Sequence, residues 1–438
     1  MVSLGCAKNL VDSEHMLGLL HADGYEPAGD LEDADIAVIN TCGFIQDAVE
    51  EAIETTLEMV RLKNRKKIHK VIVAGCFVQR YGYKLSREIP EVDGWLGTGE
   101  IHRIVEIIER GRADNGPGPM FIGRPRFLAD HTVPRLRSAP FYSAYLKIAE
   151  GCSHHCTYCM IPRLTGPYRS RTPESLVEEA TSLVRHGAKE INLVAQDISR
   201  YGQDLVPRTG IEDLLEPLLK ISGIRWLRLI YCHPEGVSER LLDLIEREEV
   251  LCPYLDIPFQ HIHPEILDKM GRSCPGEHPL ALLERIRARK RRISVRTTLM
   301  VGFPGETEAQ FQALYDFVET ARFDHLGVFV FKREKGTRAA RWGPSVPVEV
   351  SAKRRDAIMA LQAGISRTLN RRMIGRVIPV LIEGPCDETD LLLKGRSATM
   401  APEVDSQVLI NKGEGVVGEL MPVLITEAYE YDLVGEIH

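Results

Sequence analysis

The stretch Cys152-Ser-His-His-Cys156-Thr-Tyr-Cys159 decides the fold of this chain, because it places three cysteines on one short loop. The loop directly follows a predicted strand at residues 145–149, through Glu150-Gly151. Three thiolates with this spacing can hold three irons of a [4Fe–4S] cube and leave the fourth iron open. We therefore predict an iron–sulfur cluster here, whose open iron can chelate the amino and carboxylate groups of S-adenosylmethionine.

Two other interpretations of this loop are open from its residues alone. A structural zinc ion would need a fourth ligand, which His154 or His155 could provide. The three thiols could also be unrelated buried side chains. Ten cysteines in a chain of 438 residues that we expect to act inside the cell favour metal or cluster ligation over a disulfide framework.

Around the loop, residues 141–340 alternate between strands and helices. They predict about six βα units, with strands at 145–149, 190–194, 226–230, 254–257, 294–299 and 326–331. This length suits a full or partial barrel, in which the carboxyl ends of the strands carry the chemistry. Gln196 follows the second strand, and a turn with Gly302 and Glu306 follows the fifth. We predict that these three residues contact a cofactor, although a tight strand–helix turn explains the glycine equally well.

The regions on either side of this unit predict two further domains. Residues 1–110 alternate apolar runs with helical segments, which indicates an open parallel sheet covered on both faces. Glycines and prolines make residues 111–140 a predicted linker. A helix at 345–375 ends the central domain, 141–375, and residues 376–438 predict a small antiparallel β-barrel with strands at 377–382, 391–394, 408–410 and 418–425. The fold class is therefore α/β.

A second set of cysteines lies in the N-terminal domain. Cys6, Cys42 and Cys76 each follow an apolar run, so each ends a predicted strand. The carboxyl ends of parallel strands line one crevice, so three residues far apart in sequence should converge there. We predict a second three-thiolate cluster, against the alternative of three ordinary buried cysteines. The remaining cysteines lack such a pattern and are interpreted as buried or incidental thiols: Cys232, Cys252, Cys274 and Cys386.

Together these features resemble the radical S-adenosylmethionine superfamily, and within it the methylthiotransferase family, over nearly the whole chain. The resemblance implies a partial (βα)6 barrel, a C-terminal barrel of the TRAM type and two [4Fe–4S] clusters. It also implies that one S-adenosylmethionine molecule donates a methyl group to sulfur and that a second one yields the 5′-deoxyadenosyl radical. Tyr158 matches a family position that packs near the adenine.

The methylthiotransferases have two branches with different substrates. One modifies an adenosine beside the tRNA anticodon, and the other modifies an aspartate of ribosomal protein S-twelve at its β-carbon. The chain resembles the second branch in four stretches, at residues 3–14, 40–45, 194–197 and 254–261. From residue 378 onward the chain carries twelve acidic and three basic residues, whereas a tRNA-binding barrel should be basic. We therefore predict S-twelve, free or within the small subunit, as the partner, since an acidic barrel suits a basic protein.

Two alternative functions stay open on the sequence. The basic runs at 61–67 and 285–292 are either exposed helix faces or RNA contacts, so a tRNA methylthiotransferase is the first alternative. The second is a zinc-containing binding protein without catalysis, in which the acidic barrel is simply a solvated surface. Two positions also depart from the family pattern. Thr165 replaces a common arginine, whose role is not carried over, and Lys332 replaces a more usual serine.

Composition restricts where the protein acts and what it binds. The net charge of −7 argues against generic binding to nucleic-acid backbones. No run of about 18 uncharged apolar residues predicts a membrane span, and the first residues lack the pattern of a signal peptide. We expect a cytoplasmic monomer that does not associate with membranes and receives electrons from a reductant protein.

Overall fold

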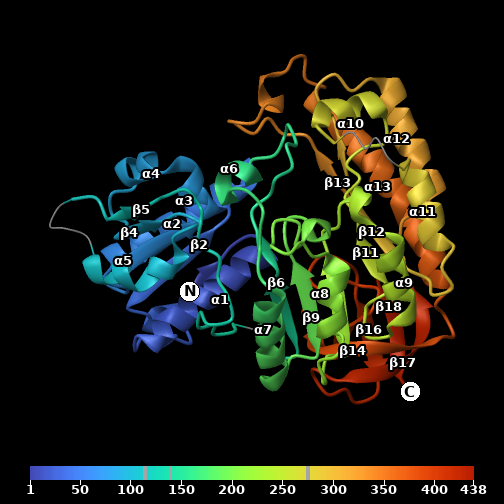
Figure 1. Cartoon of the computed structure of the whole chain (residues 1–438), viewed down its shortest axis with the longest axis horizontal. Helices are drawn as coiled ribbons and strands as arrows, with labels where there is room; N and C mark the ends of the chain where they lie inside the picture. Colours follow the sequence, from blue (N-terminus) through green and yellow to red (C-terminus); the bar gives the residue numbers. More distant parts are fainter. Residues whose placement is uncertain (112–115, 139, 273–276) are drawn as a thin grey trace.

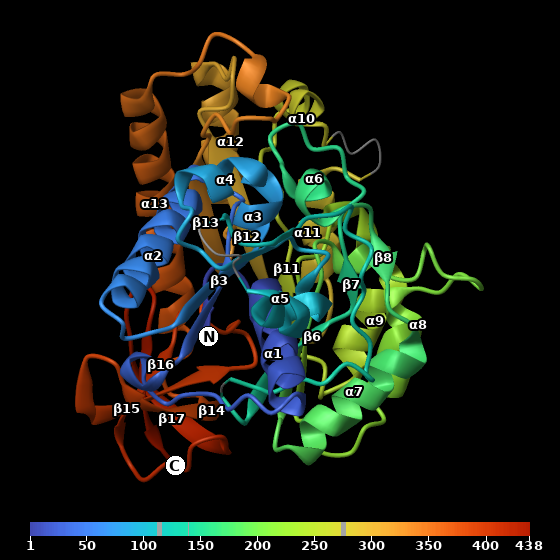
Figure 2. The ribbon, with the colours of Figure 1, turned by 90° about the vertical axis from the view of Figure 1, so that its left-hand side faces the viewer.

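The computed structural model describes residues 1–111, 116–138, 140–272 and 277–438. Three parts follow one another along the chain (Figure 1): an N-terminal sheet with its helices, a central set of βα units, and a C-terminal barrel. In Figure 2 the N-terminal part faces the viewer and the C-terminal barrel lies below it. No helix of the described residues combines the length and the apolar character that a membrane crossing requires.

The N-terminal sheet has five parallel strands in sequential order. They are β1 (Val2–Ser3), β2 (Ile36–Thr41), β3 (Lys70–Gly75), β4 (Gly94–Leu96) and β5 (Met120–Phe121). Alternate side chains of β2 and β3 pack on opposite faces. One face is covered by α1 (Ala7–Ala22) and α5 (Ile104–Arg110), the other by α2 (Gln46–Asn64), α3 (Cys76–Tyr81) and α4 (Tyr83–Glu88). The predicted parallel sheet covered on both faces is confirmed, and the segment predicted as a linker contributes its last strand.

Six parallel strands form the central unit, as the sequence predicts. Three pair as β6 (Ser143–Lys147), β9 (Glu190–Val194) and β10 (Trp226–Ile230), and three as β11 (Tyr254–Asp256), β12 (Ser294–Val301) and β13 (His325–Val330). The two sheets join between β10 and β11, where Cys232 N donates to Asp256 O at 2.8 Å. No pairing between β6 and β13 occurs among the described strands, so the barrel is partial.

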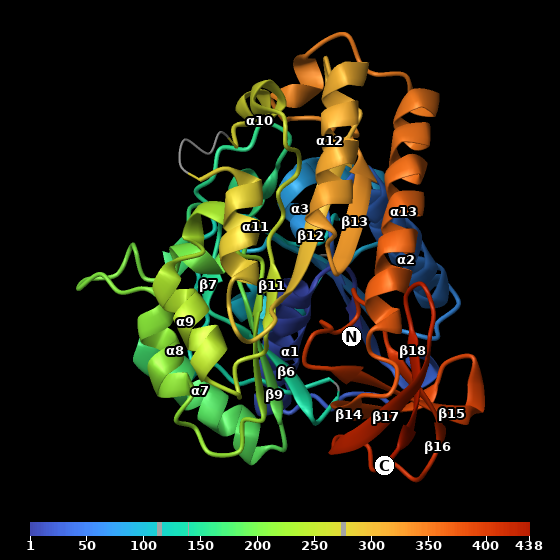
Figure 3. The same ribbon diagram turned by 90° about the vertical axis from the view of Figure 1, so that its right-hand side faces the viewer.

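Helices surround the central strands on their outer side. They are α7 (Pro173–Arg185), α8 (Ile211–Leu218), α9 (Glu239–Arg247), α10 (Pro264–Met270), α11 (Pro279–Arg287) and α12 (Glu308–Ala321). Figure 3 shows α11 and α12 beside α13 (Val348–Arg371), which leads down to the C-terminal barrel. The short elements after β6 are β7 (Ala149–Glu150), α6 (Ile161–Thr165) and β8 (Arg169–Ser170). The loop with three cysteines therefore lies at the carboxyl end of the first barrel strand.

The C-terminal barrel is closed, in the strand order β14-β15-β16-β18-β17. Its strands are β14 (Val377–Cys386), β15 (Thr389–Ser397), β16 (Val408–Lys412), β17 (Leu420–Ala428) and β18 (Leu433–Ile437). All pairs are antiparallel except β16 with β18, which is parallel. No strand was predicted at the position of β18, a five-residue strand interrupted by Gly435.

Buried ion pairs attach this barrel to the central unit. Glu190 of β9 contacts Arg228 at 3.0 Å and Arg396 of the barrel at 2.7 Å. Burial alone would raise the pKa of Glu190, but the two guanidinium groups outweigh it and hold that pKa well below its usual range. Asp405 of the barrel likewise contacts Arg296 at 3.2 Å. Some acidic side chains of the barrel, such as Asp405, thus hold the barrel against the central unit of the same chain.

Candidate functional site

All six cysteines of the two predicted triads line one cavity of about 380 Å³. The cavity lies where the carboxyl ends of the N-terminal strands meet the carboxyl ends of β6, β9, β10 and β11. Cys6 is exposed and Cys76 is buried, so the cavity extends from the surface into the contact between the two parts. The structure thereby brings together residues from positions 6 to 159 of the chain.

Backbone contacts fix the Cys152–Cys159 loop from two sides. Cys152 N donates to Gly166 O at 3.0 Å, and Thr157 N donates to Met270 O at 2.9 Å. Gly151 has a φ of +78°, and a Cβ there would lie 2.1 Å from Pro167 O. Only glycine fits this position, which turns the chain from the strand into the loop.

Close contacts between glycines and neighbouring strand ends bring Cys6, Cys42 and Cys76 together. A Cβ on Gly5 would lie 2.8 Å from Cys42 Cβ, and one on Gly43 would lie 2.6 Å from Phe77 N. Gly75, with a φ of +98°, lies against the backbone of Thr41 in the same way. The three strand ends therefore pack backbone against backbone, which is how cysteines far apart in sequence reach one crevice.

The two cysteine-bearing regions also touch each other directly. Cys76 and Phe44 form one apolar cluster with Met160 and Leu164, which follow the Cys152–Cys159 loop. In addition, Thr98 Oγ1 donates to Leu164 O at 2.5 Å. The two triads consequently face a shared space.

The six thiols of the two triads form no disulfide, and Cys76 and Cys152 are buried. Burial raises the pKa of Cys76 well above its usual value and that of Cys159 to about 12, so the thiolates need a compensating cation. Among the described residues, no three histidine, cysteine or acidic side chains are arranged to hold a single metal ion. A [4Fe–4S] cube binds each thiolate to a different iron and accepts wider spacing. The donor set fits two clusters and offers no preformed single-zinc site among these residues.

His154, named above as a possible zinc ligand, has other partners. Its Nε2 lies 2.6 Å from Asp197 Oδ2, and its ring stacks on His233 with centroids 4.6 Å apart. Burial, with Arg272 and His154 nearby, lowers the pKa of His233 to about 3, so its ring is neutral at pH 7. The backbone oxygen of His155 accepts from Arg338 at 2.6 Å. These contacts hold the loop against the carboxyl ends of β9 and β10.

The four predicted cofactor residues fall into two groups. Tyr158 and Gln196 line the cavity, and the Tyr158 ring meets Phe303 edge-on at 6.5 Å. Gly302 and Glu306 are not among the residues that line it. Glu306 is buried, lies 3.1 Å from Arg354 of α13 and 3.4 Å from His261, and accepts from Gly302 N. Glu306 therefore links the turn after β12 to α13.

Several cavity residues were missed by sequence reasoning. Lys147 of β6 pairs with both Asp12 and Glu150 beside the cavity. Burial raises the pKa of Asp12 to about 6, even though Lys147 counteracts it. Cys232, interpreted as a buried or incidental thiol, is buried and also lines the cavity, whereas Cys274 lies outside the described residues. The run at residues 3–14, which contains Asp12 and was quoted above for its resemblance to one branch of the family, gave the only hint for these residues, because charged side chains on separate elements carry no local pattern.

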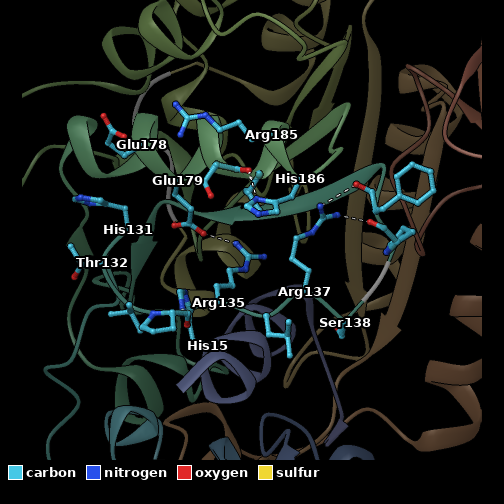
Figure 4. Close-up of a pocket in the computed structure, with 17 residues that line it drawn as sticks. His15, His131, Thr132, Arg135, Arg137, Ser138, Glu178, Glu179, Arg185 and His186 are labelled. Atoms are coloured by element: carbon cyan, nitrogen blue, oxygen red, sulfur yellow. Dashed lines mark hydrogen bonds and ion pairs between the residues drawn. The ribbon is translucent and has the colours of Figure 1, made fainter. Parts of the chain in front are cut away.

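A larger cavity of about 610 Å³ lies between α1, residues 131–138 with 140 and 141, and α7 (Figure 4). Arg135 there lies between Glu14 of α1 and Glu179 of α7, at 2.5 and 2.6 Å. Arg137 donates to the backbone oxygens of Phe141 and Ser143. These charges are used to fasten α1 to the central unit, and no cysteine lines the cavity. We assign the chemistry to the smaller cavity.

Three family models match successive parts of the chain. Residues 1–97 match an uncharacterized protein family, UPF0004, residues 146–318 match the radical SAM superfamily, and residues 374–437 match the TRAM domain. The fold and the two facing triads thus define a radical S-adenosylmethionine enzyme with a TRAM barrel.

Curated relatives identify the family more closely. Proteins of Syntrophotalea carbinolica, Pelobacter propionicus and Geobacter sulfurreducens are 48%, 47% and 47% identical over 100% of this chain and 96–98% of their own lengths. Each is named ribosomal protein uS12 methylthiotransferase RimO. The chain belongs to this RimO family of methylthiotransferases.

Solved structures support the fold. TsrM, a radical S-adenosylmethionine methyltransferase from Kitasatospora setae, was solved with cobalamin and a [4Fe–4S] cluster bound. It is similar with a TM-score of 0.55 and 17% identity, over 77% of this chain and 74% of that chain. At this identity the likeness concerns the arrangement of strands and helices alone.

Proposed function

We propose that this methylthiotransferase replaces a hydrogen on the β-carbon of an aspartate in ribosomal protein uS12, the protein S-twelve above, by a methylthio group. The observation that carries the proposal is the single cavity lined by both cysteine triads. A reaction that joins sulfur to carbon needs a sulfur-bearing site and a radical-generating site that reach one substrate. The relatives named for uS12 match this chain over its whole length, which supports the choice of substrate.

We assign one [4Fe–4S] cluster to Cys152, Cys156 and Cys159, and a second one to Cys6, Cys42 and Cys76. When bound, the first would supply the electron for cleaving S-adenosylmethionine, and the second would supply the sulfur. Tyr158 and Gln196 would contact the S-adenosylmethionine from the cavity wall.

The tRNA alternative receives little support from the basic run at 285–292. In the run at 285–292, Arg285 pairs with Glu239 at 2.8 Å and with Glu277 at 2.7 Å. Arg289 of the same run pairs with Asp243 and Glu239, and Arg291 donates to the backbone oxygen of Ile245 at 2.6 Å. These guanidinium groups are engaged within the chain, which weakens the case for an RNA-binding surface there.

Several acidic side chains of the C-terminal barrel are exposed where a basic protein could meet them. Asp387, Glu388 and Asp390 are exposed at the β14–β15 hairpin, and Glu414 is exposed before β17. Of these, Asp387 contacts Lys394 at 2.6 Å. The remaining charge is complementary to a strongly basic ribosomal protein.

The test is an anaerobic assay of the reconstituted enzyme with S-adenosylmethionine, a reductant and either isolated uS12 or small subunits. Mass spectrometry should show the gain of one methylthio group on one aspartate. Unmodified tRNA serves as the competing substrate, and methylthioadenosine formed in its place would overturn the proposal. Iron analysis should give roughly eight irons per chain, whereas zinc without iron would support a binding protein.

A further inference from the structure

Lys8, in the first turn of α1, extends into the cavity shared by the two triads. Its Nζ lies 4.0 Å from the centroid of the Tyr231 ring. A cation over an aromatic face is stabilised without having its charge neutralised, so the ammonium keeps its capacity to bind an anion. Lys8 as a whole is half-buried, and it is one of the residues that line the cavity.

Other cations near the cavity have partners that Lys8 lacks. Lys147 is held by two carboxylates, those of Asp12 and Glu150. Arg272 donates to Pro258 O at 2.8 Å and contacts the Cys156 thiol. For Lys8 the described residues provide neither an ion pair nor a side-chain hydrogen bond. A half-buried ammonium in this position can form a charge-assisted hydrogen bond with a carboxylate that enters the cavity.

The Tyr231 ring, which lies under the Lys8 ammonium, belongs to a residue whose backbone is fixed by its neighbours. Tyr231 directly follows β10 and has a φ of +68°, which is uncommon for a residue with a side chain. Its backbone oxygen accepts from Ile198 N at 3.0 Å. Backbone strain of this kind is retained where the surrounding structure fixes it, and it is frequent at functional sites. The ring therefore holds the ammonium at the wall of the cavity that both triads line.

We infer that Lys8 binds the side-chain carboxylate of the target aspartate, an inference that rests on the proposed function. The carboxyl carbon is bonded to the β-carbon, so anchoring the carboxylate fixes the carbon whose hydrogen is replaced. An asparagine at the same position would leave the ammonium without an anionic acceptor. Sites built to pair with a charged group reject neutral analogues strongly for this reason. Lys8 is thus a residue that determines specificity for aspartate.

The test compares uS12 with a uS12 variant that has asparagine in place of the modified aspartate. The wild-type enzyme should prefer the aspartate form by about a hundredfold in kcat/KM. Lys8→Met should reduce that preference to less than about tenfold, mainly by lowering kcat/KM for the aspartate form. Lys8→Arg keeps the charge and should keep the preference. Lys84→Met, a change of an exposed lysine on α4, should leave both values unchanged.

Each other outcome has a definite meaning. If Lys8→Met lowers kcat/KM for both forms by the same factor, the role of Lys8 is structural or concerns S-adenosylmethionine, and the inference is wrong. If Lys8→Met does not fold, a Lys8→Arg enzyme that loses the preference while still modifying uS12 also overturns it. A wild-type enzyme that leaves uS12 unmodified instead contradicts the proposed function itself.

Discussion

The two cysteine triads reach the same cavity by different structural routes. Cys152, Cys156 and Cys159 share one loop, whose shape is fixed by contacts of its own backbone with residues 166–168 and 270. Cys6, Cys42 and Cys76 come from three strand ends, which only the parallel sheet brings together. The first triad depends on local geometry and the second on the packing of a domain, so they should respond differently to substitution.

Loss of a thiol from the loop should have the largest effect. We expect Cys156→Ala to abolish both cleavage of S-adenosylmethionine and methylthiolation, with iron falling from roughly eight to roughly four per chain. Production of 5′-deoxyadenosine and iron analysis measure this. Cys252→Ala is the matched control, because Cys252 is buried outside the cavity. Full iron content in Cys156→Ala would show that the Cys152–Cys159 loop does not hold a cluster.

A thiol removed from the strand ends should separate the two steps. Cys42→Ala should lose methylthiolation of uS12 while it still cleaves S-adenosylmethionine, because the second site would supply sulfur and not the radical. Chromatography of 5′-deoxyadenosine together with mass spectrometry of uS12 tests this. Methylthiolated uS12 at the wild-type rate would show that Cys42 is not part of a sulfur-supplying cluster.

A backbone change should disturb only the triad that depends on packing. In Gly43→Ala the new Cβ would lie 2.6 Å from Phe77 N, so the strand ends bearing Cys42 and Cys76 must move apart. We expect iron loss from the second site and a free energy of unfolding lower by about 1–3 kcal/mol. Gly364→Ala on α13, where a Cβ meets nothing within 4 Å, should be neutral or stabilising. Equal iron content in both variants would contradict the packing explanation.

The smallest expected effect concerns a contact between the domains. Glu334 pairs with Arg80 at 2.9 Å, and Arg80 donates to Gly43 O at 2.8 Å beside Cys42. Glu334→Gln should lower the free energy of unfolding by about 1–3 kcal/mol and slow methylthiolation a few-fold. Denaturant unfolding and the uS12 assay measure both changes.

The matched control for that contact is an exposed ion pair across the same boundary. Lys332, which departs from the family pattern, contacts Asp47 at 2.5 Å with both side chains about half exposed. Lys332→Met should therefore change stability by less than about 1 kcal/mol. A larger loss of unfolding free energy in Lys332→Met than in Glu334→Gln would show that burial does not determine how much each ion pair contributes to the contact between the domains.

The sequence by itself determined the elements that depend on neighbouring residues. The spacing of the loop cysteines, the six apolar strands of the central unit and the strand-end positions of Cys6, Cys42 and Cys76 are all visible as local patterns. Such patterns are readable because the period of a strand and the reach of one loop are fixed by the chain itself. The βα units and the covered parallel sheet followed from them and are confirmed, whereas the partial form of the barrel was implied by the family resemblance and is confirmed as well.

Only the tertiary structure decided which side chains meet. Glu306 was expected beside a cofactor, but it pairs with Arg354, 48 residues away, and Asp405 of the acidic barrel pairs with Arg296. Lys8 was not selected from the sequence, because its place in the wall of the shared cavity depends on how α1 docks on β6 and β10. A charged residue takes its role from the partners that folding brings to it, and those partners leave no pattern in the adjacent sequence.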